Sequence, residues 1–119
     1  MLVEPVRSYD SRGATQLAGN EARAVDLKLT AGGLVSGMPV GTRAALVTLT
    51  VTRTIDGGYL TLFSNALEGI PATSTVNWTA SGQDVAATTT VAVDGNGLVK
   101  VAAGPNGTHF IVDVIGYYQ

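Results

Sequence analysis

The sequence predicts an all-β protein: an antiparallel β-sandwich of jelly-roll or Greek-key type, with about eight strands and no significant helix. Short runs of β-branched and aromatic residues alternate with period two, which is typical of strands. Glycine-rich turn signals separate these runs every 8–12 residues in the second half. No segment of helical length has a 3.6-residue period. At 119 residues the chain has the size of one domain, so we expect residues 1–119 to form a single sandwich.

The first half of the chain predicts three strands. Residues 3–9 form the first, and a small, polar loop follows at 13–24. Residues 25–29 alternate apolar and charged side chains, which indicates a half-exposed strand. A loop rich in glycine leads to residues 43–54, where inward apolar residues alternate with a ladder of threonines. Three apolar residues of that loop are expected to cap one end of the core: Leu34, Val35 and Met38.

The second half predicts five more strands, at 59–63, 74–79, 85–93, 98–103 and 108–118. Three turn signatures separate some of them and are interpreted as hairpins: residues 56–58, 94–97 and 105–107. We therefore expect the strand at 59–63 to pair with the one at 43–54. We also expect the strand at 98–103 to pair with the one at 85–93.

The last strand contains the longest uninterrupted apolar run. One of its faces carries Phe110, Val112, Val114 and Tyr118. The other carries His109, Ile111, Asp113, Ile115 and Tyr117. Both faces are apolar, so the strand should be covered on both sides. Core packing is expected for Trp78 and Tyr118, whereas the face with Tyr117 meets either the second sheet or another subunit.

Composition restricts the function. Charged residues make up 13% of the chain, and the net charge is −2 without any Lys/Arg cluster. Binding of nucleic acid through phosphate neutralisation is therefore not expected. The absence of cysteine excludes disulfides and thiolate metal sites, and we expect no cofactor. The first residues have no basic and apolar regions of a signal peptide, and no window predicts a membrane span.

Several motifs, in order along nearly the whole chain, resemble a β-domain common in actinobacterial secreted and cell-surface proteins. The stretch Pro5–Gly13 is similar to the family's "P-x-R-L-x-D-T-R" start. Residues 45–52 and 58–63 resemble its "L-N-V-T-V…G-F-L-T-V-Y" segment, and residues 74–78 resemble "S-N-L-N-W". The ending, Val112–Tyr118, is very like "V-D-V-x-G-Y-F/Y".

This resemblance implies a role as well as a fold. Copies of the domain often hang on secreted enzymes, and similar stand-alone chains occur among actinobacteriophage virion proteins. Because this chain begins at Met1 and shows neither a signal nor an attached enzyme, we expect a non-enzymatic virion structural protein. The concrete expectation is capsid decoration on the head exterior, with a capsid or other virion protein as partner and a homo-oligomer, a trimer by preference. The alternative is a glycan-binding or adhesion module of a phage fibre or an extracellular, cell-surface protein.

Two charged residues near the start share a strand face, because Asp10 and Arg12 are two positions apart. The resemblance implies that Asp113 lies close by. One interpretation is a carboxylate pair that binds a cation or a sugar. The other, which we favour, is a buried network that joins the N-terminal strand to the C-terminal strand. Asp113→Ala would then cost several kcal/mol of stability.

Catalytic and metal motifs are weak. No G-x-S-x-G motif is present, and a Ser-His-Asp triad would have to use His109, the single histidine. We expect His109 to be a partly exposed strand residue. Residues 94–97 carry oxygen atoms that suit calcium, but their composition is also that of a plain turn, which we favour. No enzyme and no metal site are therefore expected.

Two surfaces are candidates for an interface. The first is the second face of the last strand, with Ile111, Ile115 and Tyr117. The second is a docking arm at residues 1–5, with Met1, Leu2 and Val3. Tyr59, Trp78, Tyr9, Tyr117 and Tyr118 could instead supply an aromatic platform for a sugar. An exposed aromatic cluster with Asn and Asp around it would favour the glycan alternative, and a dry, flat apolar face would favour assembly.

Overall fold

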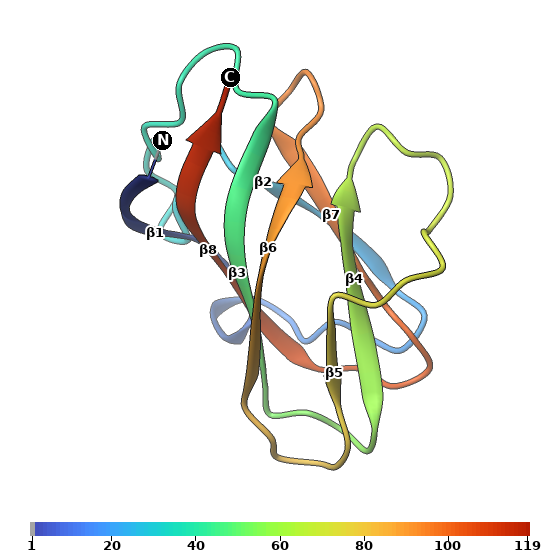
Figure 1. Cartoon of the computed structure of the whole chain (residues 1–119). Helices are drawn as coiled ribbons and strands as arrows, with labels where there is room; N and C mark the ends of the chain where they lie inside the picture. The colour runs from blue at the N-terminus through green and yellow to red at the C-terminus, as the bar shows by residue number, and fades with distance from the viewer. Residues whose placement is uncertain (1) are drawn as a thin grey trace.

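The computed structural model of the chain describes residues 2–119, which form a two-layer β-sandwich (Figure 1). Its strands are β1 (Leu2–Asp10), β2 (Ala22–Asp26), β3 (Ala44–Thr52), β4 (Gly58–Ser64), β5 (Val76–Trp78), β6 (Val85–Ala92), β7 (Leu98–Ala103) and β8 (His109–Tyr118). One 3-10 turn, η1 (Ser11–Gly13), follows β1. Within the described residues, no helix has the length and apolar character needed to cross a bilayer.

The strands form two four-stranded antiparallel sheets. The front sheet has the order β1-β8-β3-β6 and faces the viewer in Figure 1. The back sheet has the order β2-β7-β4-β5. The predicted all-β sandwich is confirmed. Two four-stranded sheets with these strand orders form a jelly roll. The jelly roll is also the first of the two topologies that the sequence predicts.

The three turn signatures reverse the chain, but none of them closes a hairpin. Each carries the chain between the sheets: β3 to β4, β6 to β7, and β7 to β8. The predicted pairings are wrong, because β3 pairs with β6 and β8, and β7 pairs with β2 and β4. Turn residues fix the local φ and ψ angles of a reversal. They do not determine the sheet in which the next strand finds its hydrogen-bond partner.

The core lies between the inner faces of the two sheets. Fully buried valine, leucine and phenylalanine side chains fill it from β3, β4, β7 and β8. Trp78 on β5 is buried, as predicted, and its indole nitrogen donates to the carbonyl oxygen of Ile55 at 3.3 Å. The alternation along β3 and β6 matches the predicted inner faces, since side chains on one face of each strand are the more buried ones.

The long connection from β2 to β3 differs from the prediction. The strand expected at 25–29 begins earlier and ends at Asp26, where a turn puts Leu29 on the surface. Leu34 and Val35 are exposed and do not cap the core, whereas Met38 packs against it. Part of this connection runs beside β1, whose Arg7 carbonyl accepts a hydrogen bond from the Ala31 amide at 2.8 Å. The side chains of Leu34 and Val35 therefore face outward, and that of Met38 faces the core.

A β-bulge near the end of β8 reverses its two faces. Ile115 has no partner on either neighbouring strand, because the pairing passes directly from Val114 to Gly116 on both sides. One extra residue exchanges the inward and outward positions that follow it. Tyr117 is consequently in the core, with 5% of its surface exposed, and Tyr118 is outside, with 43% exposed. The expected core position of Tyr118 is therefore wrong, and of the two alternatives left open for Tyr117 the structure shows burial within the sandwich.

Candidate functional site

The charged network at the edge of the front sheet has four members. Arg12 binds Asp10 with two nitrogens, at 3.0 Å from Nε to Oδ1 and 2.8 Å from Nη2 to Oδ2. Asp113 binds Arg7, at 3.0 Å from Nε to Oδ1. Arg7, which the sequence analysis missed, also lies 3.9 Å from Asp10 and so connects the two halves. The predicted residues therefore share one network, but Asp113 enters it through Arg7.

This network lies on the solvent side of the sheet. Side-chain exposure is 49% for Arg7 and 20% for Asp113, so the premise of a buried network is wrong. The hydrogen bond from the Arg12 guanidinium holds the pKa of Asp10 below its ordinary value. Each carboxylate is occupied by an arginine, and no group of three acidic or histidine side chains that could hold a metal occurs among residues 2–119. The arrangement fastens β1 to β8.

A buried serine contacts the single histidine. Ser11 Oγ lies 2.9 Å from His109 Nδ1 and accepts a hydrogen bond from the Phe110 amide at 2.7 Å. Ser11 is fully buried, so no substrate can reach its hydroxyl. Within the described part of the chain, no carboxylate contacts His109. The pair therefore attaches η1 to β8, and its members are 98 positions apart, so no local pattern in the sequence relates them.

Arg23 closes one open side of the sandwich. Its guanidinium donates to the Tyr9 hydroxyl at 2.9 Å and to the Glu21 carboxylate at 2.9 Å. It also donates to the carbonyl oxygens of Thr15 and Gln16. Because Tyr9 belongs to β1 and Arg23 to β2, this side chain connects the edge strands of the two sheets. No spacing rule in the sequence relates these partners, so this role of Arg23 was not predicted.

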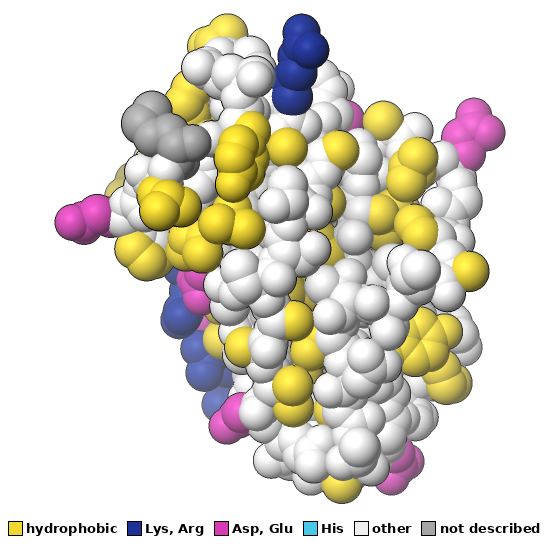
Figure 2. Space-filling view, viewed as in Figure 1, with side chains coloured by type: hydrophobic (Ala, Val, Ile, Leu, Met, Phe, Trp, Pro, Cys, Tyr) yellow, Lys and Arg dark blue, Asp and Glu magenta, His cyan; other side chains and the backbone are white. Residues whose placement is uncertain are grey.

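An apolar surface covers the end of the front sheet where β1 begins and β8 ends (Figure 2). This end patch consists of Leu2, Val40, Leu46, Ile115 and Tyr118. Leu2, Gly116 and Leu46 occupy one row across three strands, and the glycine leaves the space between the two leucines without a side chain. Leu2 is 74% exposed. Contiguous exposed apolar residues of this kind mark contact surfaces.

The interface residues predicted from the sequence are distributed differently. Leu2 and Ile115 belong to the end patch, whereas Val3 packs against the core. Ile111 and Tyr117 are each only 5% exposed and offer no surface to a partner. Met1 lies outside the described residues. The segment expected as a docking arm at 1–5 forms, from Leu2 on, the first part of strand β1.

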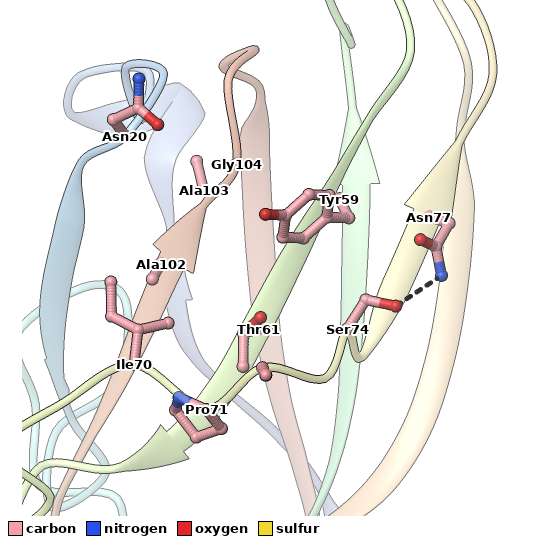
Figure 3. A pocket seen from close by; sticks show the side chains of 11 residues that line it. Asn20, Tyr59, Thr61, Ile70, Pro71, Ser74, Asn77, Ala102, Ala103 and Gly104 are labelled. Atoms are coloured by element: carbon pink, nitrogen blue, oxygen red, sulfur yellow. Dashed lines mark hydrogen bonds between the residues drawn. The ribbon is translucent and has the colours of Figure 1, made fainter.

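The outer face of the back sheet carries a groove of about 520 Å³ (Figure 3). Strands β4 and β7 form its floor, and the segment at residues 70–74 forms one wall. The wall is held in place because the Thr61 hydroxyl donates to the Thr73 carbonyl oxygen at 2.7 Å. Tyr59 projects into the groove and is 41% exposed. Asn20 lies at one end, and Asn77 lies beside Ser74 at the other.

A second hollow, of about 470 Å³, lies beside the turn at 94–97. The Asp94 carboxylate accepts hydrogen bonds from the amides of Asn96 at 2.8 Å and Leu98 at 2.9 Å. These bonds, with one from Asn65, hold the pKa of Asp94 below its ordinary value. Gly97 has a φ of 77°, which suits glycine in a turn. The carboxylate is thus used by the turn, in agreement with the interpretation favoured from the sequence.

No known family model matches the chain, and no curated protein matches it either. The resemblance to the actinobacterial β-domain therefore stays a prediction that rests on the motifs quoted above. Its terminal motif coincides with the bulged end of β8, where Gly116 lies between two leucines of neighbouring strands.

Proposed function

We propose that this chain is a non-enzymatic structural protein that works by assembly through its end patch. The observation that carries the proposal is the apolar surface made by the exposed Leu2 and Tyr118 and the half-buried Ile115 at one end of the front sheet. Burying such a surface against a partner is favourable because it removes apolar area from water, by about 25 cal/mol per Å². The inner face of the front sheet is covered by the second sheet, whereas the end patch lies on its outer face and is available to a partner.

The polar groups around the end patch favour assembly over chemistry. The neighbouring outer face carries threonines, and Thr48 and Thr88 bind each other at 2.9 Å across β3 and β6. A neutral surface of this kind imposes little desolvation cost when a partner covers it. Three charged groups of the same sheet, on Arg7, Asp10 and Asp113, already have ion-pair partners at its edge.

The specific role that we propose is that of a virion protein, most concretely capsid decoration on the outside of a bacteriophage head. The quoted sequence motifs support this role, and jelly rolls are common in viral capsid domains, which is an analogy of fold only. Capsids present local symmetry axes, so a homo-oligomer, with a trimer preferred, fits this role. A capsid or other virion protein would then cover the remaining apolar surface.

The test is the molar mass in solution by light scattering, followed by co-sedimentation with purified capsids. We expect a trimer for the parent protein and a smaller species for Tyr118→Ala, because that change removes the largest exposed side chain of the end patch. Tyr59→Ala is the matched control, since Tyr59 has nearly the same exposure on the opposite sheet. A parent protein that is monomeric and does not sediment with capsids would overturn the proposal.

A further inference from the structure

The groove on the back sheet has the features of a carbohydrate site, and we infer that it binds a neutral pyranose. This surface is distinct from the end patch, because it lies on the other sheet. Its volume of about 520 Å³ is within the range of pockets that hold small molecules. The sugar class follows from three properties of the lining: an immobilised aromatic ring, side-chain amide groups at both ends, and the absence of charge.

Tyr59 supplies the aromatic ring, and the backbone just after the end of β7 fixes its position. A Cβ added to Gly104 would lie 2.6 Å from Tyr59 Cζ, so the phenol ring lies directly on this glycine. The Gly104 amide also donates to the Tyr59 carbonyl oxygen at 3.1 Å, which aligns the two residues. Tyr59 as a whole remains 41% exposed and lines the groove. The axial C–H groups of a pyranose form an apolar face that can pack on such a ring.

Amide groups flank the ring on both sides (Figure 3). Asn20 has a φ of 62°, and its backbone amide donates to the Gly104 carbonyl oxygen at 2.7 Å, so its side chain is presented from a fixed turn. The Asn77 amide nitrogen donates to Ser74 Oγ at 3.0 Å, which leaves its carbonyl oxygen open to a ligand. Within residues 2–119, no hydrogen bond uses the Asn20 side chain or the Tyr59 hydroxyl. Vicinal sugar hydroxyls both donate and accept, and therefore match this mixed set.

The lining of the groove carries no acidic or basic side chain among the described residues. A charged ligand such as a phosphate or a uronate would find no counter-ion there, and its desolvation would be uncompensated. A purely apolar ligand would leave the flanking amide groups without hydrogen bonds. A neutral molecule with one apolar face and a rim of hydroxyls avoids both costs. Ile70 and Pro71 add an apolar wall against which the far edge of such a ring can rest.

The test is saturation-transfer difference NMR on the full chain with the methyl glycosides of glucose, galactose and mannose, with N-acetylglucosamine, and with glucuronate as the charged control. We expect transfer to at least one neutral sugar, strongest at the protons of one ring face, and none to glucuronate. Tyr59→Ala should weaken that binding about tenfold, which is the loss expected for an aromatic contact. Gly104→Ala should weaken it similarly while keeping the tyrosine, because the new methyl group displaces the ring.

Tyr118→Ala is the matched control and should leave sugar binding unchanged. Two-dimensional NMR spectra of all variants establish that each remains folded. The inference is overturned if no neutral sugar receives saturation from the parent protein, if glucuronate binds as well as the neutral sugars, or if Tyr59→Ala binds like the parent. None of these outcomes affects the molar mass, so the assembly proposal is tested separately.

Discussion

The two outer sheet faces each present one tyrosine at nearly the same exposure, 43% for Tyr118 and 41% for Tyr59. Their surroundings differ. Tyr118 belongs to the end patch, whose other members are aliphatic, whereas Tyr59 lies in a groove that has the segment at 70–74 as one wall and an asparagine at each end. Exposure alone therefore does not distinguish an assembly surface from a ligand site. The connection between β4 and β5 makes the difference, because it builds a wall over the back sheet.

The largest effect should come from the residue next to Tyr118 in the chain. Tyr117→Ala removes an aromatic side chain from the core and should destabilise the protein by about 3 kcal/mol. Tyr118→Ala should change stability by less than about 1 kcal/mol. Urea denaturation of both variants measures the difference. Equal losses would contradict the bulge at Ile115, which places Tyr117 in the core and Tyr118 in the end patch.

A smaller effect is expected for the arginine that joins the two sheets. Arg23→Ala removes four hydrogen-bonding partners at once and should cost about 2 kcal/mol. Arg23→Lys, which keeps the charge but not the planar geometry, should recover only part of this loss. The free energy of unfolding of both variants is the measurement. Full recovery by lysine would indicate that charge, and not the multiple contacts of the guanidinium, closes this side of the sandwich.

The ion pairs on the front sheet should matter less. Asp113→Ala breaks the contact with Arg7, but both side chains are partly exposed, so we expect a loss of about 0.5 kcal/mol. This replaces the several kcal/mol expected for a buried network. High salt should reduce the loss further, because it screens exposed charges. A loss above about 2 kcal/mol, unchanged by salt, would restore the buried interpretation.

The smallest effect is a decline of stability in acid. Asp10, Glu21 and Asp94 all have lowered pKa values, in the last case chiefly because the Leu98 amide donates to the carboxylate. Their contribution is complete above the ordinary values of 3.8 for Asp and 4.5 for Glu, and is lost as the pH falls through the lowered values. Urea midpoints between pH 6 and pH 2 measure the decline. In Asp94→Asn the urea midpoint should fall less between pH 6 and pH 2 than in the parent protein. An equal fall would count against the role of this carboxylate.

The sequence by itself determined the positions of most strands, most inner faces and the all-β class. Each strand's period-two pattern is local, so Val47, Leu49 and Val51 are buried as predicted. Turn residues likewise marked where the chain reverses. The sequence motifs also identified Asp10, Arg12 and Asp113 as members of one network, although Arg7, which connects them, was missed.

Only the tertiary structure decided how these parts combine. Whether a turn closes a hairpin or crosses to the other sheet depends on which strands, distant in sequence, together bury both inner faces and satisfy their backbone hydrogen bonds. The same long-range pairing leaves Ile115 unpaired and turns Tyr117 inward. It also brings Asn20, Tyr59 and Asn77 around one groove. No local pattern encodes these relations, because each requires residues from three or more strands or loops to meet.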